Sequence, residues 1–232
     1  MTLQSFDEAR DLLVVIAAYN EQAVIAGVVA DLVNRGYEVA VVDDGSHDET
    51  SERAEKADAT VIKHSINLGQ GAALQTGLEY GLRSGYRFFV TFDADGQHDP
   101  DDIPRLRNRM IEMNADFVLG SRFLGGTVGM TKPRRLLLKA AVLFTRLTTG
   151  LRLTDAHNGL RLLSKRAATA IDLRQNRMAH ASEILDQIAT SGLVYVECPV
   201  TIRYTDYSKA KGQSGLNSLN ILLDLFLQRL RK

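Results

Sequence analysis

Two carboxylates, one residue apart, follow an apolar run and carry the strongest chemical signal in the chain. Asp93 and Asp95 come directly after residues 86–92, whose composition predicts a buried strand. Carboxylates at this spacing repel each other unless a cation lies between them, and Mg²⁺ or Mn²⁺ binds such oxygens together with substrate phosphates. Alone, the pattern also fits an exposed loop. Together with the motifs below, it predicts a divalent-metal site.

Two earlier apolar runs also end in polar residues. Residues 12–18 end at Tyr19 and Glu21, and residues 38–42 end at Asp43 and Asp44. The carboxyl ends of parallel strands meet along one edge of a sheet, where open α/β sheets bind their ligands. An aromatic face for stacking and carboxylates for ribose hydroxyls or a base N–H fit a nucleotide at this edge. Core packing of Tyr19 and a turn role for Asp44 are the structural alternatives.

Five motifs in a fixed order resemble the inverting glycosyltransferases of family 2. They are Ala18-Tyr19-Asn20-Glu21, Val42-Asp43-Asp44-Gly45-Ser46, Asn67-Leu68-Gly69-Gln70-Gly71, Asp93-Ala94-Asp95-Gly96-Gln97 and Gly120-Ser121-Arg122. The resemblance covers most of the chain and is strongest to the dolichol or polyprenol phosphate mannose and glucose synthases. It implies a metal-dependent enzyme that moves a hexosyl unit, with inversion, from a UDP- or GDP-sugar to a polyprenyl phosphate.

The resemblance also implies which residues contact the metal and the donor. Asp95 is the direct metal ligand, Asp93 lies nearer the ribose and the metal-bound waters, and Gln97 approaches the metal. His98 is expected to form a hydrogen bond beneath this loop rather than to bind the metal. The residues expected to contact the nucleotide sugar are Ala17, Tyr19, Glu21, Asp43, Asp44, Asn67, Gly69, Asp93 and Ala94.

Two later segments add charge near the sugar and the diphosphate. Arg203 and Lys209 resemble the mobile segment that closes over the diphosphate in this family, where cations neutralise the leaving group. Whether Lys209 or Lys211 meets the phosphate stays open, and a solvated basic loop is the alternative. The segment from Asp155 to Arg161 resembles the family's Asp-x-x-x-Gly-x-Arg segment, which adds Arg161 near the sugar.

The nature of the acceptor decides which other residues must act. A lipid phosphate is already an anion and needs only cations, which Arg122, Arg134 and Arg135 would supply. A saccharide hydroxyl needs a general base, and Glu183 or Asp155 is the candidate. We expect a polyprenyl phosphate acceptor, with a saccharide hydroxyl in cell-surface glycan synthesis as the alternative.

Two further classes of protein are disfavoured. A catalytically silent sugar-nucleotide-binding or scaffold subunit would have no need of Asp93, Asp95 and Arg203. A processive polysaccharide synthase would carry a Gln-x-x-Arg-Trp motif, and this chain has no tryptophan.

The charge of the chain is balanced overall but not along its length. Of 232 residues, 28 are basic and 28 are acidic, so net charge gives no reason to expect a nucleic-acid partner. No Asp or Glu occurs between Phe117 and Thr154. That stretch predicts a surface for an anionic acceptor or an anionic lipid leaflet, with a solvated helix face as the alternative.

The remaining composition predicts the compartment. The single cysteine, Cys198, lies in an apolar run and is expected to be a buried, reduced thiol. The sequence has neither the pattern of a signal peptide nor an apolar run long enough to span a membrane. We therefore expect a cytoplasmic protein that is soluble or peripheral at the cytosolic membrane face.

Strands and helices alternate along the first part of the chain, which predicts an α/β fold. We expect a mostly parallel, Rossmann-like nucleotide-binding sheet flanked by helices, of the GT-A type that the resemblance implies. Residues 1–232 are expected to form one glycosyltransferase domain, in which about 10–120 bind the nucleotide sugar and about 121–215 the acceptor. Residues 216–232 predict an amphipathic helix that packs in the core or forms a homo-oligomer, with membrane-surface docking as the alternative.

Overall fold

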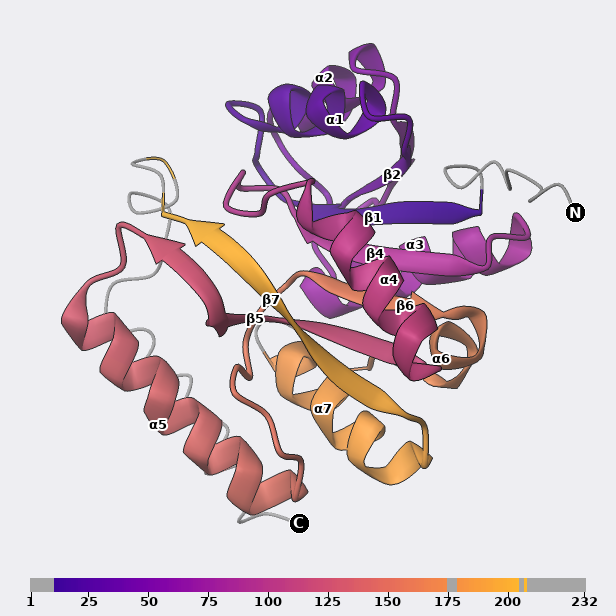
Figure 1. The fold of residues 1–232 in the computed structure, drawn as a ribbon. Helices are drawn as coiled ribbons and strands as arrows, with labels where there is room; N and C mark the ends of the chain where they lie inside the picture. The colour runs from indigo at the N-terminus through magenta and orange to yellow at the C-terminus, as the bar shows by residue number, and fades with distance from the viewer. Residues whose placement is uncertain (1–10, 175–178, 205–206, 208–232) are drawn as a thin grey trace, which may run out of the picture.

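The structure is a computed structural model that describes residues 11–174, 179–204 and 207. Within these residues the chain forms a seven-stranded sheet in the order β3-β2-β1-β4-β6-β5-β7 (Figure 1). The strands are β1 Leu12–Ala18, β2 Glu38–Asp43, β3 Thr60–Lys63, β4 Phe88–Asp93, β5 Phe117–Val128, β6 Arg161–Ser164 and β7 Tyr195–Arg203. The predicted helix at residues 216–232 lies outside the described residues.

The sheet is mostly parallel, as the alternating pattern predicted. β1 to β4 pair in parallel, as do β5 and β7, whereas β6 runs antiparallel to both β4 and β5. Because β6 is reversed, its first residue, Arg161, lies at the edge where the neighbouring strands have their carboxyl ends. The sequence did not predict β6, which has only four residues and leads directly into a helix.

Helices cover both faces of the sheet (Figure 1). One core contains side chains of α1 Ile25–Val33, α2 Thr50–Lys56 and α4 Asp102–Met113. The other core contains side chains of α3 Gln70–Arg83, α5 Lys132–Thr149, α6 Lys165–Ala170 and α7 Ala179–Ser191. This three-layer arrangement confirms the predicted α/β class, and the two covered faces explain why β1, inside the sheet, is apolar throughout.

Glycines allow α3 to lie close against the sheet. A Cβ at Gly77 would overlap the Val15 side chain, and a Cβ at Gly81 would come within 2.6 Å of the Phe89 ring. These glycines therefore serve helix packing. The close approach fixes the amino end of α3, which begins beside the ends of β1 and β4.

β7 lies at one edge of the described sheet, where Pro199 costs no ladder hydrogen bond to a further strand. The pairing of β5 with β7 is irregular between Ser121 and Gly126, opposite Pro199 and Thr201. The sequence predicted an edge or a bulge at Pro199, and the structure has both. Cys198 is buried, also as expected.

Among the described residues, no helix has both the length and the apolar character that crossing a membrane requires.

Candidate active site

β1, β2 and β4 end at the same level, which brings their polar residues together. In the register of the sheet, Ala17 lies beside both Val42 and Asp93, and Ala18 lies beside Asp43. The acidic residues at the ends of β2 and β4 therefore flank the turn that follows β1. The three strand ends meet at one edge of the sheet, as the sequence predicted.

The turn after β1 is fixed by the loop after β2. The backbone N–H of Asn20 donates to Ser46 Oγ at 2.9 Å, and that of Glu21 donates to Thr50 Oγ1 at 2.8 Å. Asn20 adopts the left-handed conformation with φ of 52°, which asparagine tolerates better than most residues. Tyr19, which precedes it, is 40% exposed. The ring is thus presented to solvent, where stacking on a base is feasible, and is not packed in the core.

Asp43 is buried at the end of β2 and already accepts two hydrogen bonds. Its Oδ1 accepts from the backbone N–H of Ser46 at 2.8 Å, and its Oδ2 accepts from the Ser51 hydroxyl and lies 4.0 Å from the ammonium of Lys63. The side chain is fully buried, so in the described structure these interactions fix the loop after β2 and do not present the carboxylate to solvent.

Asp44 fixes the loop that precedes α3. Its carboxylate accepts from the backbone N–H groups of Leu68 and Gly69 at 2.9 and 2.7 Å, and lies 2.8 Å from His64 Nδ1. Asn67 and Gly69, which were predicted to contact the nucleotide sugar, are thereby held beside the end of β2. Asp44 has a structural role in the described fold, which was one of the two interpretations of its sequence position.

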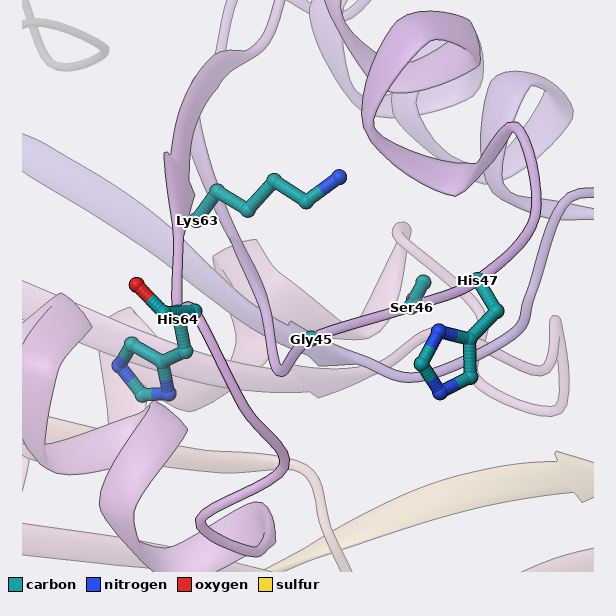
Figure 2. A pocket seen from close by; sticks show the side chains of 6 residues that line it. Gly45, Ser46, His47, Lys63 and His64 are labelled. Atoms are coloured by element: carbon teal, nitrogen blue, oxygen red, sulfur yellow. The ribbon is translucent and has the colours of Figure 1, made fainter.

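A pocket of about 340 Å³ opens beside the ends of β2 and β3 (Figure 2). Its walls come from the loop after β2 and from the end of β3 and the two residues that follow it. The lining residues are Gly45, Ser46, His47, Lys63, His64 and Ser65. The pocket adjoins the two buried aspartates, but the residues predicted to bind the donor do not line it.

Asp93 is surrounded by groups that favour its charged form. Its Oδ2 lies 2.9 Å from His98 Nε2, and Gln70 Nε2 lies 3.5 Å from its Oδ1. Burial raises the pKa of Asp93, but the charge and hydrogen bond of His98, with the charge of Arg161, hold that pKa at about 2. His98 thus makes the hydrogen bond that the sequence led us to expect.

Asp95 has less favourable surroundings. Burial and the nearby charge of Asp93 raise the pKa of Asp95, and its oxygens accept from the backbone N–H and side-chain amide of Gln97 at 3.1 and 2.5 Å. A divalent cation would relieve the repulsion between the two carboxylates. The opposite orientation of the Gln97 amide would present an oxygen to that cation.

The described residues contain no group of three or more His, Cys, Asp or Glu side chains that could hold a metal ion. The arrangement at Asp95 nevertheless fits a hard cation that takes few protein ligands. Mg²⁺ in particular is commonly bound by one or two carboxylates and completes its shell with substrate phosphates and water.

Arg122 connects the residues predicted to meet the acceptor. Its Nε donates to Asp155 Oδ2 at 2.6 Å, its Nη1 to the Tyr204 hydroxyl at 3.0 Å, and its Nη2 to the His157 carbonyl at 2.7 Å. The guanidinium of Arg134 lies over the Tyr204 ring, 4.7 Å from its centroid. Tyr204 thus joins two of the predicted acceptor arginines. We call Arg122, Arg134, Tyr204 and Asp155 the arginine cluster.

Glu197 on β7 holds the segment that carries Asp155. Its carboxylate accepts from the backbone N–H groups of Thr154 and Asp155 at 2.8 and 3.0 Å. We did not anticipate Glu197 or Tyr204 from the sequence. A glutamate within an apolar strand was the available signal, because a carboxylate there needs hydrogen-bond donors.

Arg203 and Glu21 each have a partner in the described structure. Arg203 Nη2 lies 2.8 Å from Asp99 Oδ2, and the backbone N–H of Arg203 donates to the Gln97 carbonyl at 3.0 Å. The Tyr207 hydroxyl donates to Glu21 Oε2 at 2.7 Å. The end of β7 therefore lies beside the loop that carries Asp95. Lys209, the other predicted cation, lies outside the described residues.

Two residues that were predicted to act on the acceptor, Arg135 and Glu183, are not part of the arginine cluster. Arg135 is exposed on α5. Glu183, the predicted base for a hydroxyl acceptor, lies on α7, where its carboxylate oxygens accept from the backbone N–H of Arg174 at 3.2 Å.

The site combines paired carboxylates with the turns that follow β1 and β2, all at the ligand-binding edge of an α/β sheet. This is the framework of a nucleotide-sugar glycosyltransferase. Residues 13–171 match the model of Glycosyl transferase family 2, and the chain belongs to this family. It is therefore a glycosyltransferase, as its five motifs predicted.

Relatives and solved structures agree with this assignment. The chain is 32% identical to UDP-N-acetylglucosamine–dolichyl-phosphate N-acetylglucosaminyltransferase of Methanococcus voltae, over 95% of this chain and 97% of the relative. It is 33% identical to polyprenol monophosphomannose synthase of Mycolicibacterium smegmatis, over 88% and 82% of the two chains. Glucosyl-3-phosphoglycerate synthase from Mycobacterium tuberculosis, solved with Mn²⁺ and UDP-glucose, has a TM-score of 0.68 at 20% identity and covers 90% of this chain and 73% of its own. This structural likeness supports the GT-A fold.

Proposed function

We propose that this glycosyltransferase moves a hexosyl unit, with inversion, from a UDP- or GDP-sugar to the phosphate of a polyprenyl, dolichyl-type lipid. The arginine cluster is the observation that carries the proposal. Arg122 and Arg134 both contact Tyr204. Both arginines lie in the stretch from Phe117 to Thr154, which has no acidic residue. Arg122 is paired with Asp155, so the exposed guanidinium of Arg134 is the cation that favours an anionic acceptor. The names of the M. voltae and M. smegmatis relatives also point to lipid phosphates or their products.

The donor would lie along the edge formed by the ends of β1, β2 and β4. Tyr19 and Glu21 would contact the nucleoside, and Asp95, with Asp93 and Gln97, would hold a divalent cation against the diphosphate. Such a cation, Mg²⁺ or Mn²⁺, neutralises charge on the departing nucleoside diphosphate. The M. tuberculosis neighbour was solved with Mn²⁺ and UDP-glucose, which supports a divalent cation and a nucleotide-sugar donor in general.

The protein's own residues would bind and orient the two anions. In the transfer, an oxygen of the lipid phosphate attacks the anomeric carbon as the bond from that carbon to the donor's diphosphate oxygen breaks. The attacking oxygen carries no proton, so no general base is required. The exposed Arg134 would hold the lipid phosphate, and Arg122, paired with Asp155, would position Tyr204 beside it. Arg161, buried beside Asp93, would fix the sugar end of the site.

A saccharide hydroxyl is the second candidate acceptor, and one observation favours it. Asp155 Oδ1 is buried and has no hydrogen-bond partner among the described residues, so it is placed to accept a proton. The ion pair of Asp155 with Arg122 and its bonds within the arginine cluster favour the structural role instead.

The test is a transfer assay with the purified full-length chain, Mn²⁺, and a panel of UDP- and GDP-sugars, with and without polyprenyl phosphate. We expect equimolar glycolipid and nucleoside diphosphate for one donor, and loss of both products when the metal is chelated. Transfer to a saccharide, with none to polyprenyl phosphate, would contradict the proposal. Because a polyprenyl chain lies in the bilayer, the proposal also requires the enzyme to work at a membrane surface.

A further inference from the structure

The outward face of α5 carries a row of exposed leucines. Leu136, Leu143 and Leu147 are 72%, 59% and 78% exposed. With Ala140 they are spaced four, three and four residues apart, which places them in one line along the helix. We call these four residues the leucine stripe.

The leucine stripe is not the face that attaches α5 to the protein. The buried residues of α5 are Ala141, Val142 and Thr145, and the helix packs against α7. Figure 1 shows α5 along one margin of the fold, where it starts near the end of β5 and runs past α7. The leucines therefore face outward although the helix is anchored on its other side.

A row of basic residues runs beside the leucine stripe. Lys132, Arg135, Lys139 and Arg146 are all exposed, and their spacing places them along one flank of the stripe. No acidic residue occurs anywhere in α5 or in the segments that flank it. The outward surface of α5 thus combines an apolar line with positive charge that forms no ion pair among the described residues.

We infer that α5 docks flat on an anionic phospholipid surface. A helix with an apolar face and flanking Lys and Arg lies at the membrane interface, with its apolar side chains at the acyl boundary and its cations against the headgroups. The charge of the basic row selects this occupant. A second copy of α5 has no acidic residue, and the tail at residues 216–232 has a single acidic residue, Asp224, against three basic ones.

The position of the arginine cluster agrees with this docking. Arg134, in the first turn of α5, lies over the ring of Tyr204, whose hydroxyl accepts from Arg122. Docking of α5 would therefore bring the cluster close to the headgroups. This part of the inference rests on the proposed function, because only a lipid acceptor gives that position a purpose.

The test measures binding of the full-length chain to vesicles, with neither donor nor acceptor present. We expect the wild type to sediment with vesicles that contain phosphatidylglycerol and to remain in solution with phosphatidylcholine alone. The variant Leu143→Glu/Leu147→Glu should bind anionic vesicles at least about tenfold more weakly, because it places two charges in the apolar line. Ile111→Glu is the matched control, since Ile111 is 65% exposed but lies on α4; it should bind as the wild type does.

Two results would overturn the inference. One is vesicle binding that the double variant retains in full, which would assign docking to another part of the chain. The other is that the wild type binds no anionic vesicles. If the wild type is then oligomeric and the double variant is not, the leucine stripe is a contact between copies. Circular dichroism of both variants verifies that they fold.

An activity measurement separates this inference from the proposed function. The double variant should match the wild type with a short, water-soluble prenyl phosphate and lose activity with a long-chain acceptor in vesicles. Stripe-dependent vesicle binding without transfer to either acceptor would support the docking and contradict the proposed function.

Discussion

The carboxylate of Asp93 lies directly against Gly159, and a Cβ at that position would overlap both carboxylate oxygens. The Gly159 carbonyl accepts a hydrogen bond from Thr91 Oγ1 at 2.6 Å. Thr91 precedes Asp93 by two residues on β4. The glycine of the Asp-x-x-x-Gly-x-Arg segment therefore lets the segment cross the end of β4 without displacing the carboxylate.

Gly159→Ala should consequently impair turnover more than stability. The added methyl group would push Asp93 away from its present position, and misplacement by about 1 Å at a reacting site costs on the order of a hundredfold in rate. Gly27→Ala on α1 is the control, because a Cβ there meets nothing within 4 Å. Steady-state kinetics and thermal unfolding of both variants check this. A fully active Gly159→Ala enzyme would show that the position of Asp93 is unimportant.

Asp95→Asn should abolish turnover while the protein stays folded. The change removes one anionic ligand from the proposed metal site, and asparagine has nearly the same shape and volume as aspartate. Titration of Mn²⁺ by calorimetry, with and without UDP-sugar, should show weaker binding in the variant. Asp101→Asn is the control, since among the described residues the exposed Asp101 side chain pairs with Arg35 alone. An enzyme that ignores chelators and tolerates Asp95→Asn has no metal at this position.

Arg203→Ala should lower kcat more than it lowers the affinity for Mn²⁺. The guanidinium would act on the diphosphate as negative charge develops there, so its loss affects the transition state more than the ground state. Asp99→Asn is the informative companion, because it removes the carboxylate that lies 2.8 Å from Arg203 but leaves the cation. We expect Asp99→Asn to retain activity. Equal kcat in Arg203→Ala and the wild type would reduce Arg203 to a surface residue of β7.

His157 should make stability depend on pH below neutrality. Burial, with the charges of Arg161 and Arg122, lowers the pKa of His157 from 6.5 to about 4 in the folded state. The unfolded chain therefore binds a proton that the folded chain does not, and stability that is full above pH 6.5 is lost as the pH falls toward 4. The loss amounts to up to about 3 kcal/mol of unfolding free energy.

Urea unfolding of the wild type and His157→Gln across this range measures the effect. The difference in unfolding free energy between the two proteins should shrink or reverse in favour of the variant as the pH falls. Parallel pH profiles would contradict the assignment of a neutral, buried imidazole.

The sheet and its acidic edge were predictable because local signals agreed with the fold. Apolar runs of strand length alternate with helical patterns, and each run ends in a polar turn, so the parallel order followed from general rules. The meeting of Tyr19, Asp43 and Asp93 at one edge then required no further information. Pro199 in an apolar run correctly indicated an edge strand.

The arginine cluster was only partly predictable because it depends on contacts between distant segments. Arg122 and Arg134 were identified from their motifs and charge, but Tyr204, which connects them, lies some 70 residues beyond Arg134 and outside any motif that we used. β6 escaped prediction because four residues do not establish a period of two. Its reversed direction, which places Arg161 at the site, is a property of tertiary pairing.

The acceptor is the central claim, and the most direct test compares two changes in one transfer assay with polyprenyl phosphate. Arg134→Ala/Arg135→Ala should strongly raise the acceptor concentration required, while slow hydrolysis of the donor by water persists. Glu183→Gln should retain most of its transfer rate, because an anionic phosphate oxygen has no proton to lose. Removal of a general base normally costs on the order of a hundredfold or more. Collapse of transfer in Glu183→Gln, with an indifferent arginine double variant, would contradict the account and assign the enzyme a hydroxyl acceptor.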